Sequence, residues 1–287
     1  MKVCVVLLGA LPLVGLLAAC SGGSSHDGTH VVASFYPFAF VAEQVGGRAV
    51  EVDNLTAPGT EPHDIELRPK QVGAIQEADL VVYQRGFQTA VDDAVDRAHR
   101  DDAELVDVAD LVPSTRDPHT WLDPHTMIAV TRAVRAKLSE ADPDHAAAYT
   151  ANATRLEQQL DDLDHDLAAG LRTCRTRTIV TSHAAFGHLA ARYDLHQVPI
   201  AGIDPMNEPA PSELARISDL VRREHITTVF TEELVSPAIA ETVARETGAR
   251  TATLDPIEGL GHDAGDETYL TLMRDDLDAI RKANGCS

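Results

Sequence analysis

The stretch Asp142–Arg172, DPDHAAAYTANATRLEQQLDDLDHDLAAGLR, decides the fold because it is long, helical in pattern and placed between two similar halves. It contains no proline after Pro143, and its large apolar residues recur at steps of three, four and seven: Tyr149, Leu156, Leu160, Leu163, Leu167 and Leu171. This spacing puts them on one face of a helix. We predict a helix of about thirty residues, roughly 45 Å long, that runs along both halves and resists a wide hinge motion.

The halves on either side begin alike. His30–Phe35 (HVVASF) and Thr178–His183 (TIVTSH) each have the pattern of a buried strand, and Ser34 and Ser182 are 148 positions apart. The same shift pairs two further apolar strand candidates, Ala78–Tyr83 and Ile226–Thr231. Strands that alternate with helical crossovers imply parallel sheets covered by helices. We therefore predict an α/β fold of two similar lobes, and we interpret them as an internal structural duplication.

The amino terminus predicts export. Lys2 is followed by an apolar run, Val3–Ala19, that is too short for a comfortable membrane span and is typical of a signal peptide. The run closes with Leu-Ala-Ala-Cys20, which resembles a lipoprotein signal in which Cys20 carries the lipid. Ordinary secretory cleavage with a free Cys20 is the alternative. We divide the chain into a signal peptide (1–19), a flexible tether (20–29), an N-terminal lobe (30–141), the linking helix (142–173) and a C-terminal lobe (174–287).

Charge and cysteine content narrow the class of partners. Without Lys2, 23 of the 24 Lys and Arg residues remain against 45 Asp and Glu residues, a net charge of −22. Such an acidic protein is a poor nucleic-acid binder, whereas a cation is a plausible ligand. Outside the signal and the lipidation motif only Cys174 and Cys286 remain, and in an oxidising compartment we predict that they form a disulfide. Two separate thiols are the alternative.

Three of the thirteen histidines are candidate metal ligands because they lie in turns of the α/β pattern. His63 follows a strand candidate near Val50, His119 lies beside Trp121, and His183 ends its own strand. Asp255 also ends a strand, and open parallel sheets form their sites at the carboxyl ends of strands. Three imidazoles and one carboxylate suit a four-coordinate zinc ion. Taken singly, each residue could equally serve as a cap, a turn residue or a buried packing residue.

The same residues lie in motifs that resemble the zinc-type metal-binding receptors of bacterial ABC importers. The most specific are P-H-D-x-x-L-R-P around His63 and H-x-W-L-D-P around His119, and further matching segments cover nearly the whole chain after the signal: Phe35–Phe38, Ala78–Tyr83, Ser182–His183, Gly202–Pro209 and Leu254–Gly259. The resemblance implies two α/β lobes joined by one long helix, with the metal in the cleft between them. It assigns His63, His119, His183 and Asp255 as the ligands.

What the resemblance implies for function is capture of Zn²⁺ and delivery to a permease with its ATPase. The protein would be a monomeric receptor, not an enzyme, held on the outer face of the cell membrane by its lipid. Manganese-type relatives carry Glu where this chain has His183, so a manganese receptor is the nearest alternative. A zinc hydrolase is a second one, with Asp64 and Glu61 as candidate bases by proximity. An adhesin role is a third, which nothing in the sequence tests.

The resemblance has one departure. Many zinc receptors carry a long loop rich in His and Asp before the second ligand, whereas here only Val112–Pro118 precedes His119. Loop-based zinc collection is therefore not expected. His26 and His30 near the tether are candidates only for weak additional sites.

Overall fold

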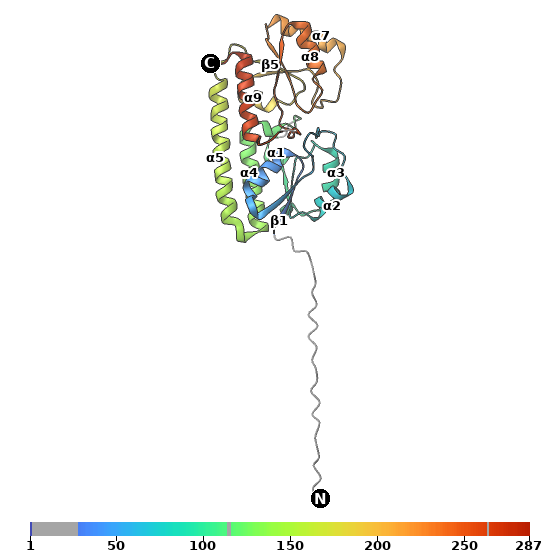
Figure 1. The fold of residues 1–287 in the computed structure, drawn as a ribbon, viewed down its shortest axis with the longest axis vertical. Coiled ribbons are helices and arrows are strands. Elements are labelled where there is room, and N and C mark those ends of the chain that lie inside the picture. The colour runs from blue at the N-terminus through green and yellow to red at the C-terminus, as the bar shows by residue number, and fades with distance from the viewer. Residues whose placement is uncertain (2–27, 114–115, 263) are drawn as a thin grey trace.

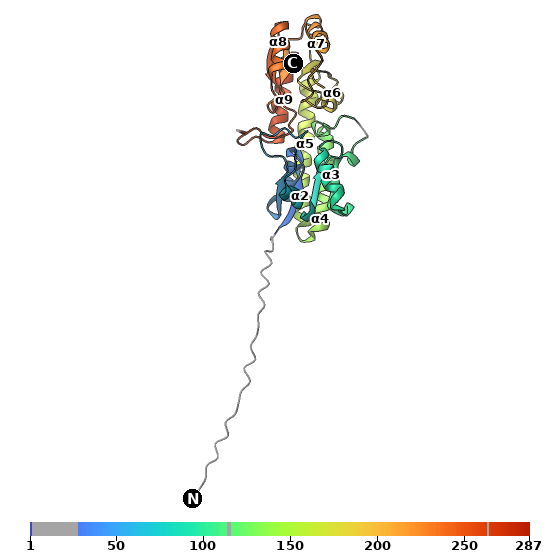
Figure 2. The same cartoon turned by 90° about the vertical axis from the view of Figure 1, so that its right-hand side faces the viewer.

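The computed structural model describes Met1 and residues 28–113, 116–262 and 264–287. The rest of the expected signal peptide, the lipidation candidate Cys20 and tether residues 20–27 lie outside the described residues. The described chain forms two α/β lobes along a long helix (Figure 1), and the perpendicular view shows the same two-part arrangement (Figure 2). Within the residues described, no helix is long and apolar enough to cross a membrane.

The N-terminal lobe has a four-stranded parallel sheet in the order β2-β1-β3-β4. Its helices lie on both faces, because alternate strand residues point to opposite sides: Val31 and Val82 pack toward α1 and α4, whereas Val32 and Val81 pack toward α2 and α3. The elements are β1 Thr29–Ala33, α1 Tyr36–Gly46, β2 Val50–Asn54, α2 Pro69–Glu77, β3 Leu80–Tyr83, α3 Thr89–Ala98, β4 Leu105–Asp107 and α4 Pro124–Ala141.

The C-terminal lobe repeats this arrangement with the order β6-β5-β7-β8, again all parallel. Val180, Val198 and Val229 face α7 and α8, and Ile179 and Phe230 face the core shared with α9. The two sheets therefore have the same order of strands. This agrees with the two similar lobes that the repeat in the sequence predicts. The elements are β5 Thr178–Thr181, α6 Gly187–Arg192, β6 His196–Pro199, α7 Pro211–Arg223, β7 Thr228–Thr231, α8 Ala238–Thr247, β8 Arg250–Thr253 and α9 Tyr269–Asn284.

The long helix predicted from the leucine spacing is α5, Ala146–Leu171, and all six of its predicted apolar residues are buried. It starts four residues later than the pattern suggests, because α4 ends at Ala141 and Pro143–His145 forms a 3₁₀ turn. The 26 residues correspond to about 39 Å. Since α1, α4 and α9 all pack on α5, one core cluster extends through both lobes.

Short 3₁₀ turns complete the chain: Gly47–Ala49, Asp102–Glu104, Val108–Leu111 and Thr120–Leu122. The first of these begins where Gly47 takes a φ of 58° and ends α1, a conformation that favours glycine. At the far end of α5, Cys174 and Cys286 form a disulfide that joins the chain after α5 to the chain after α9. These are the two cysteines that we predict from the sequence to form a disulfide in an oxidising compartment.

Candidate metal site

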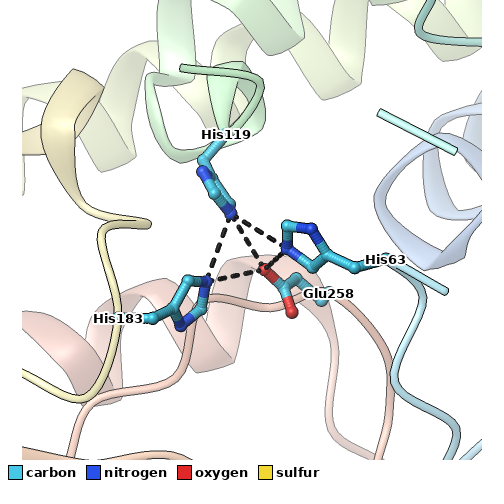
Figure 3. Close-up of side chains that lie close together, drawn as sticks. All are labelled: His63, His119, His183 and Glu258. Carbon is cyan, nitrogen blue, oxygen red and sulfur yellow. Dashed lines mark hydrogen bonds and ion pairs between the residues drawn. The ribbon is translucent and has the colours of Figure 1, made fainter. Parts of the chain in front are cut away.

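Three histidines and one glutamate meet where the two lobes face each other (Figure 3). His63 and His119 come from loops of the N-terminal lobe, and His183 and Glu258 follow β5 and β8 of the C-terminal lobe. His119, His183 and Glu258 are buried, and the His63 side chain is only 7 % exposed. The structure thus brings the three predicted histidines together from both lobes.

Five of the six distances among the four donor atoms match tetrahedral coordination of a single ion. Nε2 of His119 lies 3.3 Å from Nε2 of His63 and 3.2 Å from Nε2 of His183. Oε1 of Glu258 lies 3.3, 3.2 and 3.3 Å from Nε2 of His63, His119 and His183. A zinc ion about 2.0–2.1 Å from four tetrahedral ligands would hold them about 3.3 Å apart. The donor set is therefore already at zinc-binding distances.

Two of the imidazoles are held from behind by carboxylates. Asp117 Oδ1 lies 2.7 Å from Nδ1 of His119 and accepts a hydrogen bond from the His119 backbone N–H. Glu232 does the same for His183, with carboxylate oxygens 2.8 and 2.9 Å from Nδ1. A carboxylate on Nδ1 favours the tautomer that leaves Nε2 free to bind a metal.

His63 is supported differently. Its backbone N–H donates to the Glu61 carboxylate, and its ring packs edge-on against Phe87 at a centroid distance of 4.7 Å. Among the residues that the structure describes, no carboxylate contacts its Nδ1. The ring of His63 is therefore held by packing and by the loop, rather than by a charged partner.

The electrostatics of the cluster are dominated by burial and by the close carboxylates. Burial alone lowers the pKa of His183, but hydrogen bonds to Glu232 and Glu258 reverse the shift and raise this pKa to about 10. The pKa of His119 is raised in the same way by Asp117 and Glu258 against the effect of burial. Burial raises the pKa of Glu258, but hydrogen bonds from the three histidines outweigh it and hold this pKa well below its usual value. The carboxylate is thus ionised and available to a cation.

Asp255, the fourth ligand expected from the sequence, is not in this group. It is buried, its Oδ1 accepts a hydrogen bond from Ile257 N–H at 2.8 Å, and burial raises its pKa to about 7. The carboxylate in the group is that of Glu258, three residues on. Between them Ile257 has a φ of 55°, rare for a branched residue, and this turn follows the strand end and leads into Glu258. The sequence shows that Leu254–Gly259 contains two acids. It does not show the turn that places Glu258, rather than Asp255, beside the three histidines.

The loops that carry the ligands are bonded to each other across the lobes. Trp121 Nε1 donates to the carbonyl of Pro256 at 2.7 Å, and Tyr269 OH donates to the carbonyl of Trp121 at 2.7 Å. All of these groups are buried. The loop of His119 and the loop of Glu258 are consequently held at a fixed separation.

Two similar lobes with one shared set of metal donors between them define a two-lobed metal-binding receptor. The chain belongs to the family described as zinc-uptake complex component A, periplasmic (ZnuA), whose model matches residues 31–283. This confirms the resemblance drawn from the motifs.

Individual relatives agree with the family. The chain is 32 % identical to the high-affinity zinc uptake system protein ZnuA of Bacillus subtilis, over 93 % of each chain. It is 33 % identical to the zinc-binding lipoprotein AdcA of Streptococcus pneumoniae, over 98 % of this chain but only 61 % of that longer protein. The Zn(II)-bound ZnuA-like domain of Streptococcus pneumoniae AdcA matches with a TM-score of 0.78 at 33 % identity, over 90 % of this chain and 99 % of that domain.

Proposed function

We propose that this protein is an extracytoplasmic zinc receptor that captures Zn²⁺ with His63, His119, His183 and Glu258. The observation that carries the proposal is the spacing of the four donors, which is 3.2–3.3 Å for five of the six pairs of donor atoms. Glu258 takes the place that the sequence analysis gave to Asp255. Zinc is the cargo of this site, bound for transport.

The donor chemistry favours zinc over manganese. Imidazole nitrogen suits zinc and other late divalent ions, whereas carboxylate, carbonyl and water oxygens suit Mn²⁺. Three imidazoles with one carboxylate are therefore a poor set for manganese. Four protein donors around a tetrahedral ion also leave no open position for a reactive water, which a zinc hydrolase needs. Both considerations support a closed receptor site.

Delivery and anchoring complete the proposal. The receptor passes zinc to the permease of an ABC importer, which works with its ATPase, while lipid on Cys20 holds it at the outer face of the cell membrane. The lipoprotein-like signal around Cys20 and the likeness to a zinc-binding lipoprotein support this arrangement. Mass spectrometry of the mature amino terminus checks it: a lipid on Cys20 is expected, and a free cysteine would contradict the anchor.

The ligand set is tested by zinc titration of the wild type, Glu258→Gln and the matched control Asp255→Asn. We expect one zinc per chain, a loss of affinity of at least a hundredfold in Glu258→Gln, and a change of only a few-fold in Asp255→Asn. The reverse ranking would return the fourth ligand to Asp255. Tighter binding of Mn²⁺ than of Zn²⁺ by the wild type would make the protein a manganese receptor.

A further inference from the structure

Glu232 is a buried acid that no motif in the sequence singles out. It follows β7 directly, and its side chain is 1 % exposed. Its Oε1 accepts a hydrogen bond from the backbone N–H of His183 at 3.1 Å, while both oxygens face Nδ1 of the same ring at 2.8–2.9 Å. One carboxylate thus holds both the backbone and the ring of His183.

The other lobe uses the equivalent position for the same purpose. Gln84 follows β3 directly and stands 148 positions before Glu232, the shift that relates the two halves. Its Nε2 donates to the carbonyl of Pro118, and its Oε1 accepts from Thr120 Oγ1 at 2.6 Å, so it holds the residues on either side of His119. In each lobe, therefore, the loop that carries a histidine ligand is anchored by the residue that directly follows one strand: β3 in the N-terminal lobe and β7 in the C-terminal lobe.

The two anchors differ in charge, and the difference matters to a divalent ion. Gln84 is a neutral amide, whereas Glu232 is a carboxylic acid placed beside a site where His119, His183 and Glu258 are all buried. Zinc bound by three neutral imidazoles and one carboxylate leaves a net charge of +1. Because an unbalanced charge is costly in a buried environment, a second carboxylate beside a ligand stabilises the bound ion. Asp117, which holds His119, is 21 % exposed, so Glu232 is the fully buried carboxylate that offsets this charge.

We propose that Glu232 is a positioning residue for zinc binding: it fixes the ring of His183 with Nε2 toward the cleft and places a buried carboxylate behind this ligand. This inference rests on the proposed function. It assigns Glu232 a role in affinity through His183, without direct contact with the ion.

The test compares Glu232→Gln with the neighbouring control Glu233→Gln, which makes the same chemical change at an exposed position. Glu232→Gln keeps the shape of the side chain and gives this lobe the residue type found at position 84. We expect zinc affinity, measured by competition with a chelator, to fall about 10–100-fold in Glu232→Gln and to stay within twofold in Glu233→Gln. Glu232→Asp, which keeps the charge on a shorter side chain, should recover part of the loss.

A second readout separates positioning from general stability. In the zinc-loaded protein, the Nδ1 proton of His183 should give an NMR resonance shifted downfield by the carboxylate. The resonance should move upfield in Glu232→Gln and stay in place in Glu233→Gln. A Glu232→Gln protein with unchanged zinc affinity, or with an unchanged Nδ1 resonance, would overturn the inference while leaving the receptor function intact. A wild type that binds no zinc would overturn the receptor function itself.

Discussion

His183 and His63 contribute the same imidazole to one cluster, but the two lobes hold them by different means. His183 is fully buried, and Glu232 holds it at Nδ1 and at the backbone. His63 lies on the loop between β2 and α2, where most of the neighbouring residues are exposed or half-buried, and its ring rests against Phe87. We therefore expect the C-terminal lobe to hold its ligand more firmly, and we expect His63 to be the ligand that is easiest to displace.

The largest difference between the two lobes is expected in the free energy of unfolding when His183 and His63 are each replaced by alanine. His183→Ala leaves Glu232 buried without its partner, so it should lower the free energy of unfolding of the metal-free protein by about 3–5 kcal/mol as well as abolish tight zinc binding. His63→Ala should also abolish tight binding but change stability by about 1 kcal/mol or less. Chemical denaturation of both variants without metal measures the difference. Equal losses of stability would show that the two ligands are held alike.

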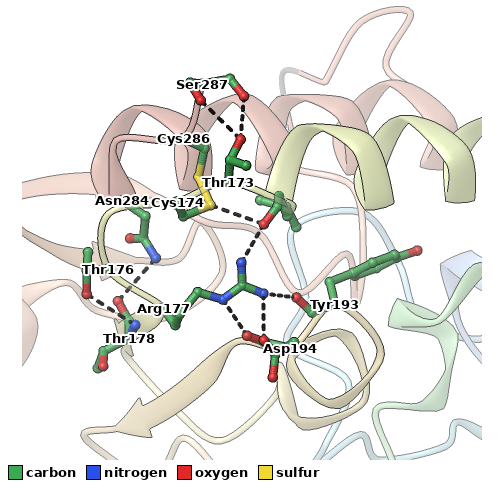
Figure 4. The surroundings of a disulfide bond; sticks show 11 residues. Thr173, Cys174, Thr176, Arg177, Thr178, Tyr193, Asp194, Asn284, Cys286 and Ser287 are labelled. Atoms are coloured by element: carbon green, nitrogen blue, oxygen red, sulfur yellow. Dashed lines mark hydrogen bonds and ion pairs between the residues drawn. A yellow bond between two sulfur atoms is a disulfide. The ribbon is translucent and has the colours of Figure 1, made fainter.

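The disulfide provides a second contrast, because it lies in one lobe only. Cys174 and Cys286 are 112 residues apart in the sequence, and their disulfide joins the chain just after α5 to the chain just after α9 (Figure 4). Replacing both with alanine should cost roughly 2–5 kcal/mol of stability. Hydrogen exchange should rise in β5 and α9 more than in β1–β4, while zinc affinity stays within about threefold. A large fall in affinity would mean that the disulfide also shapes the site.

The pH dependence should reflect the strongly held histidine. Below its raised pKa of about 10, His183 is protonated in the metal-free protein, and zinc must displace that proton. Apparent zinc affinity should therefore fall about tenfold per pH unit for each proton displaced as pH drops from 8 to 6. Titration calorimetry at several pH values measures this slope. Affinity unchanged between pH 7.5 and pH 5 would contradict the histidine ligands.

The stability of the metal-free protein should show the opposite trend. A histidine with a raised folded-state pKa contributes stability that is fully present below its unfolded value of about 6.5 and is lost as pH rises toward about 10. Thermal unfolding without metal should therefore occur at progressively lower temperature across this interval. His183→Ala should flatten this dependence, and a slope that survives the substitution would have to come from another group.

The smallest change in zinc affinity is expected when Gln84, the neutral residue that anchors the loop of His119, is replaced. Gln84→Ala removes the bonds to Pro118 and Thr120 but takes no charge from the centre. Zinc affinity should fall about tenfold or less, at the lower end of the range for groups that orient a ligand. Competition titration beside Glu232→Gln compares the anchors of the two lobes directly. A larger loss in Gln84→Ala than in Glu232→Gln would show that charge matters less than backbone position.

Much of this architecture could be predicted from the sequence because it depends on local periodicity. The leucine spacing of α5 and the apolar runs of β1, β3, β5 and β7 predict elements directly, and the repeat predicts two similar sheets. The motifs around His63 and His119 also identified residues that meet in the structure. The start of α5 was placed too early, because the pattern does not show where α4 ends and the 3₁₀ turn begins.

What the sequence could not give depends on contacts between separate strands. Glu232 lies 49 residues from His183, and only the pairing of β5 with β7 brings them together. The local sequence could not show that Glu258 lies beside the three histidines while Asp255 does not, since this depends on the left-handed turn at Ile257. Nothing in the local pattern of Leu254–Gly259 marks that turn, because a β-branched residue such as Ile257 rarely adopts a left-handed conformation.

The bonds at Trp121 have an optical consequence. Trp121 is the only tryptophan in the chain, and it is fully buried. Its ring centre lies 5.2 Å from that of His119, and its indole N–H is bonded to the loop that carries Glu258. All tryptophan fluorescence from this protein therefore comes from the contact between the two lobes. The chain carries an intrinsic fluorophore at the one place where filling and emptying of the site would alter its surroundings.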